Sequence, residues 1–121
     1  MTKLKFMQAI ATNWAIKAFG VEHVLDGRVR ALRFLEEAVE LAQALGVTKQ
    51  KVVLLLDTVY NKPPGDKKQE IGGSFLTLLV LCSSTTDDPE TCLENELFRV
   101  LQKPIEEFAE RNKTKIHFGL D

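Results

Sequence analysis

The stretch from Glu70 to Cys82 constrains the fold more than any other part of the chain, because its apolar residues point in nearly every direction of a helix. At about 100° per residue, the only polar stripe is narrow and consists of Glu70, Ser74 and Thr77. A helix that is apolar almost all round is a buried helix. The sequence therefore predicts a helical protein in which other helices enclose this segment.

The rest of the chain also has helical periodicity, and no segment reads as a strand. Gly20 and Gly46 end two apolar patterns, and Thr48 and Asp66 are suited to cap the helices that follow. Pro104 lies inside the last pattern and predicts a break near Lys103, because proline cannot continue a helix. We expect an all-α bundle of about five helices in one domain over residues 1–121, with helices at 2–19, 28–45, 48–60, 67–84 and 89–112.

Composition excludes several classes of partner. The 16 Lys and Arg residues are balanced by 17 Asp and Glu, and a net charge of −1 lacks the basic surface that a nucleic acid polymer requires. The most apolar run, from Phe75 to Cys82, is far shorter than the roughly 20 residues that span a membrane. No signal peptide is recognisable, and Cys82 and Cys92 are expected to be free thiols of a cytoplasmic protein.

The helix expected over 28–45 carries acids on its polar half. Glu37 and Glu40 are three residues apart, so their side chains can reach one common point, and Glu36 is four residues from Glu40. Arg33 has the spacing to pair with Glu37, which would make this an ordinary solvated helix face. Arg33 is also a candidate contact for a phosphate.

Glu70 argues against an ordinary solvated face for these acids, because it lies on the only polar stripe of the most apolar helix. If Glu70 faces Glu37 and Glu40 across a bundle, three carboxylates converge and require a divalent cation. Oxygen ligands alone favour Mg²⁺ or Mn²⁺. The alternative is a first-turn glutamate that is open to water and stabilised by the helix dipole.

Other metal centres lack their ligands. No Cys-x-x-Cys motif occurs, and neither His23 nor His117 has a partner at the spacing of a zinc site. A di-iron helical bundle requires Glu-x-x-His motifs. Here Gly20 and Thr114 stand three residues before the two histidines.

One combination of motifs resembles a known family. Glu36-Glu37-x-x-Glu40 is followed, after a loop, by Glu70-Ile71-Gly72 at the start of an apolar helix. This combination is similar to the MazG-like all-α nucleoside triphosphate pyrophosphohydrolases, and more closely to a small stand-alone branch in bacteria and phages. The likeness covers about residues 10–112. The closer match also includes Trp14-Ala15, Phe19-Gly20, Arg30 to Ala38 and Gln69 to Gly73.

The resemblance implies hydrolysis of a nucleoside triphosphate between its α- and β-phosphates, giving the monophosphate and pyrophosphate in nucleotide-pool housecleaning. It implies Mg²⁺, or Mn²⁺, held by Glu37, Glu40 and Glu70. Glu36, or Glu37 when it is not a ligand, would take the proton of the attacking water. Related enzymes are dimers or tetramers, which agrees with the large apolar surface of the predicted helices.

The chain departs from the family motif at one position. The motif has a fourth acid three residues after the glutamate, and this chain has Gly73 there. Ser74 with a bound water, Asp57 or Asp66 are the alternatives for the missing ligand. Lost activity is the other interpretation, and it predicts a catalytically silent helical module that binds a nucleotide or a partner. A purely structural bundle is the third.

Three more residues are candidates for substrate binding, each with a structural alternative. Arg99 and Lys103 correspond to a basic pair that the family has on its last helix. They are also spaced to pair with Glu96 and Glu107 on the surface. Trp14, the single tryptophan, is suited either to stack on a nucleobase or to pack in the core.

Overall fold

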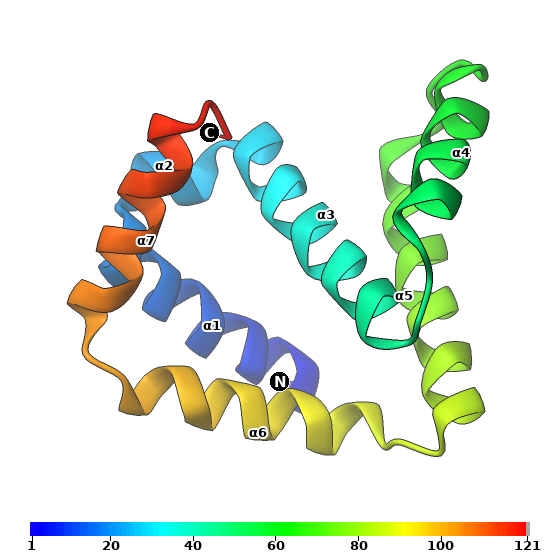
Figure 1. The fold of residues 1–121 in the computed structure, drawn as a ribbon. Coiled ribbons are helices and arrows are strands. Elements are labelled where there is room, and N and C mark those ends of the chain that lie inside the picture. The colour runs from blue at the N-terminus through cyan, green and yellow to red at the C-terminus, as the bar shows by residue number, and fades with distance from the viewer. Residues whose placement is uncertain (121) are drawn as a thin grey trace.

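A computed structural model describes residues 1–120, so Asp121, the last residue of the expected domain, lies outside the description. Over these residues the chain is all-α, as predicted, with no strand (Figure 1). The helices are α1 (Lys3–Phe19), α2 (Val21–Leu25), α3 (Gly27–Ala44), α4 (Lys49–Tyr60), α5 (Lys67–Thr85), α6 (Pro89–Gln102) and α7 (Ile105–His117).

The count of about five helices was too low, for two local reasons. Gly20 has a φ of 89°, which ends α1 and lets the chain restart as the short helix α2. Lys103, with φ −83° and ψ 150°, is extended ahead of Pro104 and separates α6 from α7. The break near Lys103 is therefore confirmed, and α7 continues beyond the expected end to His117.

The predicted capping residues hold the helix starts. The side chain of Thr48 accepts a hydrogen bond from the Lys51 amide, and that of Asp66 accepts one from the Gln69 amide. These oxygens satisfy amide groups that have no partner within the first turn. The boundaries of α4 and α5 are therefore encoded locally.

A small core joins α1, α6 and α7. Ala18, Val100 and Phe108 are buried together. Trp14 packs edge-on against Phe108, with ring centroids 4.9 Å apart and planes at 85°. The structural interpretation of Trp14 as a core residue is thus confirmed. The other side chains that pack on this core are Phe19, Leu97 and Ile105.

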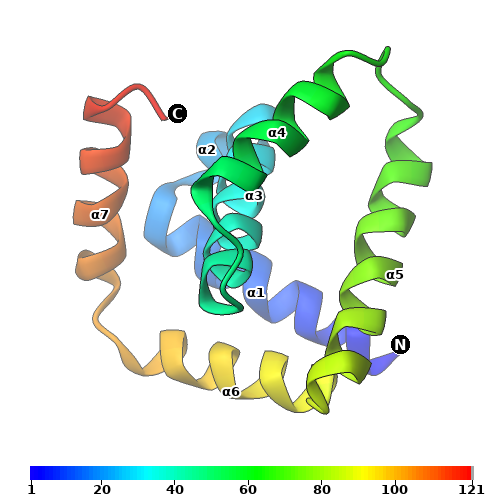
Figure 2. The ribbon, with the colours of Figure 1, turned by 45° about the vertical axis from the view of Figure 1, so that its right-hand side comes forward.

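The helices form an open arrangement. The most extensive packing is that of α1 with α2 and α7, and of α2 with α3; within residues 1–120, neither α4 nor α5 takes part in packing of this extent. In both ribbon views α5 and α7 lie at opposite ends of the molecule, connected by α6 (Figures 1 and 2). None of the described helices has the length and hydrophobicity that crossing a bilayer requires.

The expected enclosure of the helix over 70–82 is not achieved within one chain. Residues 71–80 of α5 are all exposed, and within the segment 70–82 only Leu81 and Cys82 are partly or fully buried. The physical reason is that α3 diverges from α4 and α5 instead of packing along them (Figure 1). Cys82 and Cys92 are both free thiols, as expected.

Candidate functional site

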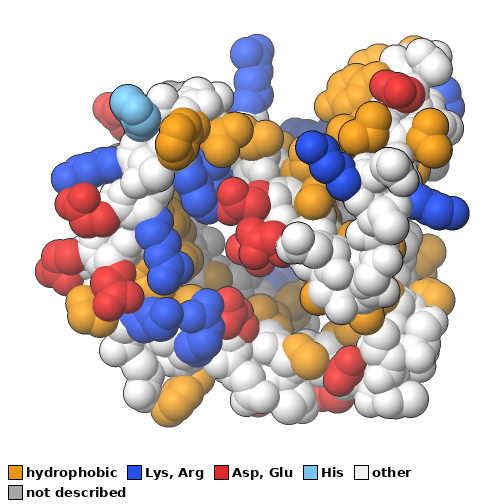
Figure 3. Space-filling model, viewed as in Figure 1, with side chains coloured by type: hydrophobic (Ala, Val, Ile, Leu, Met, Phe, Trp, Pro, Cys, Tyr) orange, Lys and Arg blue, Asp and Glu red, His pale blue; other side chains and the backbone are white. Residues whose placement is uncertain are grey.

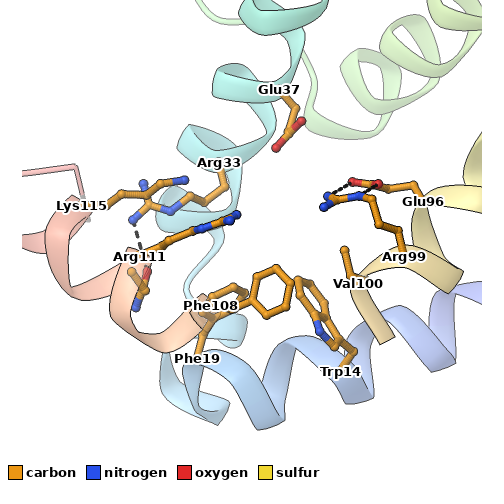
Figure 4. Close-up of a pocket in the computed structure, with 11 residues that line it drawn as sticks. Trp14, Phe19, Arg33, Glu37, Glu96, Arg99, Val100, Phe108, Arg111 and Lys115 are labelled. Carbon is orange, nitrogen blue, oxygen red and sulfur yellow. Dashed lines mark hydrogen bonds and ion pairs between the residues drawn. The ribbon is translucent and has the colours of Figure 1, made fainter. Parts of the chain in front are cut away.

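A cavity of about 160 Å³ lies where α1, α3, α6 and α7 meet. Pockets for whole drug-sized ligands measure roughly 300–1,000 Å³, so this cavity has room for part of such a ligand. Figure 4 shows the side chains that surround it. The lining residues are Trp14, Phe19, Arg33, Glu37, Glu96, Arg99, Val100, Phe108, Arg111, Asn112 and Lys115.

One wall of the cavity is aromatic. Trp14 of α1 contacts both Phe19 and Phe108 edge-on, at centroid distances of 5.6 and 4.9 Å. The indole Nε1 of Trp14 is buried and has no hydrogen-bond partner among the described residues. The wall therefore presents flat apolar surface to the cavity.

Four cationic side chains surround the rest of the cavity, and they come from three helices (Figure 4). Arg99 of α6 forms two hydrogen bonds to Glu96, at 2.5 and 2.8 Å, which confirms their predicted pairing. On α7, the Arg111 guanidinium lies 5.7 Å from the centroid of the Phe108 ring.

Arg33 and Lys115 bring α3 and the C-terminal end of the chain together. Arg33 donates to the Leu120 carbonyl at 2.6 Å and to the Asn112 side-chain oxygen at 3.4 Å, so the expected pairing with Glu37 is replaced by contacts to the C-terminal segment. Lys115 forms an ion pair with Glu36. Every contact holds a cation at the edge of the cavity.

Three carboxylates lie together on α3 beside this cavity. Glu36, Glu37 and Glu40 each offer an oxygen, and these oxygens all lie within 4.8 Å of one another. Glu37 is exposed but loses part of its hydration beside the cavity; this desolvation raises its pKa, and the charges of Glu40 and Glu36 raise it further. In the space-filling view, acidic and basic side chains lie close together between α7 and α3 (Figure 3).

Glu70 is not part of this group. It lies exposed in the first turn of α5, and a Cβ added to Gly65 would approach its Oε1 to 2.8 Å. The carboxylate is therefore turned back toward the preceding loop. Ser74 donates its hydroxyl hydrogen bond to the Glu70 carbonyl within the helix. In the single chain, Glu70 corresponds to the water-exposed alternative.

The donor set on α3 fits a hard divalent cation. Glu36, Glu37 and Glu40 offer carboxylate oxygen alone, which Mg²⁺ and Mn²⁺ prefer. Glu37 and Glu40 are exposed, while Glu36 is half-buried and engaged with Lys115. The two exposed carboxylates are therefore the available ligands.

The structure brings together most of the predicted site residues. Trp14, Arg33, Glu37 and Arg99 line one cavity, whereas Lys103 is half-buried and lies outside its lining. The residues that α7 contributes to the cavity were not predicted from the sequence. The signal was a stripe at helical spacing that turns from apolar to polar, namely Phe108, Arg111, Asn112 and Lys115.

Comparison with protein families, with curated proteins and with solved structures finds no match to this chain.

Proposed function

We propose that this chain is a Mg²⁺-dependent nucleoside triphosphate pyrophosphohydrolase, with Mn²⁺ as the alternative ion. The observation that carries the proposal is the juxtaposition of the Glu36, Glu37 and Glu40 carboxylates with a cavity lined by four cations and an aromatic wall. A nucleoside triphosphate has the complementary parts, which are a flat base, a polyanion and metal-binding oxygens. The product pair would be the monophosphate and pyrophosphate.

The cations would act on the polyphosphate. Phosphoryl transfer relies mainly on positioning and charge stabilisation. The cavity is lined by four cations from three helices, namely Arg33, Arg99, Arg111 and Lys115. Arg99 is paired with Glu96 at the surface, where ion pairs contribute little to stability. Arg99 would therefore lose little free energy when it exchanges Glu96 for a phosphate.

The acids would hold the metal and move the proton. Glu37 and Glu40 would be ligands, and the bound ion would neutralise phosphate charge and lower the pKa of the attacking water. Glu36, or Glu37 when it is not a ligand, would accept the proton of that water. The raised pKa of Glu37 brings this carboxylate closer to the range where a general base is effective.

The aromatic wall would receive the base. Trp14 is half-buried and lines the cavity. Its packing on Phe108 fixes the indole plane, and a fixed plane reduces the entropy lost when a base binds. Trp14 would therefore serve the core and the substrate together. Lys103 would serve only as a distant charge on the phosphate side.

A second candidate function is a catalytically silent helical module that binds a nucleotide or another partner. Two observations favour it: Gly73 stands where the resembling family has an acid, and Glu70 lies outside the carboxylate group of its own chain. This module would still bind phosphate through the cationic cavity. It would release no pyrophosphate.

Product analysis separates the two functions. The wild-type protein would be given a panel of ribo- and deoxyribonucleoside triphosphates with Mg²⁺ or Mn²⁺, beside Glu37→Gln and Glu70→Gln. The enzyme produces monophosphate and pyrophosphate in equal amounts, and the Glu37→Gln and Glu70→Gln proteins both lose this activity. Glu106→Gln, an exposed acid of the first turn of α7, is the control that retains activity. Nucleotide binding without products identifies the silent module.

The proposed enzyme would act in the cytoplasm, where it meets the nucleotide pool. We propose that it works as a homodimer or homotetramer, since much of its apolar surface is uncovered in one chain.

A further inference from the structure

The α4–α5 segment, residues 49–85, exposes an unusual amount of apolar surface. Its twelve large exposed hydrophobic side chains are between 39% and 81% exposed. Monomeric proteins rarely leave apolar patches of more than a few hundred Å² in contact with water. The residues are Val53, Leu54, Leu55, Leu56, Val59, Tyr60, Ile71, Phe75, Leu76, Leu78, Leu79 and Val80.

Closure within one chain would not cover this surface. The apolar side chains of α5 surround the helix axis, so packing α5 onto α3 of the same chain would bury one side and leave the others in water. Residues 71–86 contain no charged side chain that would keep an outer side soluble. Whatever covers the apolar surface of α4 and α5 must therefore supply further helix surface of its own.

A second copy has the matching surface on α3. Five large apolar side chains of α3 and its C-cap are between 37% and 58% exposed: Phe34, Leu35, Val39, Leu41 and Leu45. Full burial of one such side chain removes roughly 100 Å² from water. If each exposed apolar side chain of α3, α4 and α5 loses about half of that area on docking, each copy buries roughly 800 Å². This is the area that each partner buries in a stable interface of standard size.

Docking of α5 of one copy on α3 of another would also bring the Glu70 carboxylate close to α3. Glu70 is the only acid in α5, and it stands at the start of the uncharged run. The α3 surface that offers Phe34 and Leu41 also carries Glu37, which lies three residues after Phe34 and four before Leu41, and Glu40 lies one turn on from Glu37. A second copy that lays α5 along α3 therefore brings its single acid to the side of the helix that needs another oxygen ligand.

We propose that two copies of this chain pack reciprocally, with the α4–α5 segment of each copy on α3 of the other, and that Glu70 of one copy joins Glu37 and Glu40 of its partner. The placement of Glu70 as a metal ligand rests on the proposed function. The docking itself rests on the apolar surface alone. The metal site of one copy is then incomplete without the other.

The first test measures mass in solution. Light scattering of the wild-type protein at micromolar concentration is expected to give at least twice 13.6 kDa. Leu54→Glu and Leu76→Glu, at positions 66% and 65% exposed, are expected to give monomers. Phe98→Glu on α6 is the matched control, since Phe98 is 66% exposed outside the proposed interface, and it retains the wild-type mass. A wild-type monomer overturns the proposal.

The second test asks whether Glu70 reaches the other copy. One chain carries Glu40→Cys and a second, differently tagged chain carries Glu70→Cys, both in a Cys82→Ser, Cys92→Ser background. Co-expression followed by mild oxidation is expected to give mainly the covalent pair of the two different chains. Little of this pair, together with an intrachain bond when both substitutions are in one chain, means closure within the chain and overturns the proposal.

Neither readout uses a nucleotide. A protein that is dimeric and cross-links between copies, yet hydrolyses no nucleoside triphosphate, contradicts the proposed function and leaves the docking standing. A monomer that releases pyrophosphate contradicts the docking and supports the function. Circular dichroism of each variant, with wild-type helix content expected, ensures that a change in mass does not report unfolding.

Discussion

Lys115 of α7 donates a hydrogen bond to the carboxylate of Glu36 on α3, joining two residues that are 79 positions apart in the sequence. Both side chains are 31% exposed, so the ion pair is partly shielded from water. This contact places a positive charge next to the carboxylate group of α3. The C-terminal helix therefore influences the titration of acids that lie far away along the chain.

Lys115→Met is expected to raise the pKa of Glu37 further. Desolvation is the main cause of the raised value, Glu40 and Glu36 add to it, and Lys115 opposes it. Removing the ammonium group takes away the opposing effect. Carboxyl chemical shifts followed by NMR against pH would show the change. Lys113→Met removes an equal charge from an exposed pair with Glu110 and leaves the Glu37 titration in place.

Phe108→Ala is expected to lower the free energy of unfolding by about 3 kcal/mol or more, the usual cost of truncating a buried phenylalanine. Phe108 is 6% exposed and contacts Trp14 in the core between α1, α6 and α7. Chemical denaturation at one fixed protein concentration gives the value. Phe98→Ala removes the same atoms at a position 66% exposed and should cost far less; equal losses would show that the described core is not the stabilising one.

The helices were predictable because their ends are encoded locally. Thr48 and Asp66 cap the helices that follow them, and Pro104 breaks the last helix beside Lys103. Each of these effects involves residues within one turn of one another. The short helix α2 was missed because five residues are too few to show a period.

The candidate site was predictable only in part, because it depends on how helices meet. Glu37 and Glu40 share a turn of α3, so their proximity follows from spacing. Arg111 and Lys115 reach the same cavity through the packing of α7 on α1, which joins distant parts of the chain. The position of Glu70 depends on the direction of α5, and no local pattern sets that direction.

Arg111→Met is expected to weaken the binding of inorganic pyrophosphate about tenfold or more. A hydrogen bond to a charged group contributes roughly 1.5–3 kcal/mol, and about 1.4 kcal/mol is a factor of ten in affinity. Arg111 lines the cavity, and its guanidinium lies over Phe108. Isothermal titration calorimetry measures the change. Arg28→Met, an exposed arginine outside the cavity, should keep the wild-type affinity, and equal weakening in both variants would mean that pyrophosphate binds by net charge alone.

The raised pKa of Glu37 predicts how stability depends on pH in the absence of divalent cations. Between the ordinary value of 4.5 and the raised value, the folded protein binds more protons at this carboxyl than the unfolded chain does. The contribution of Glu37 to the free energy of unfolding therefore falls as the pH rises through that window.

Glu37→Gln has no proton to lose there, so its stability relative to the wild type is expected to increase across the window. Urea denaturation of both proteins on either side of the window measures the difference, with Glu106→Gln as a control whose difference from the wild type stays constant. If the carboxylates of α3 bind Mg²⁺ or Mn²⁺, adding the ion should stabilise the wild type above the window and reverse the advantage of Glu37→Gln, because the ion neutralises the crowded charges. A pH-independent difference between the two proteins would contradict the assigned crowding of Glu36, Glu37 and Glu40.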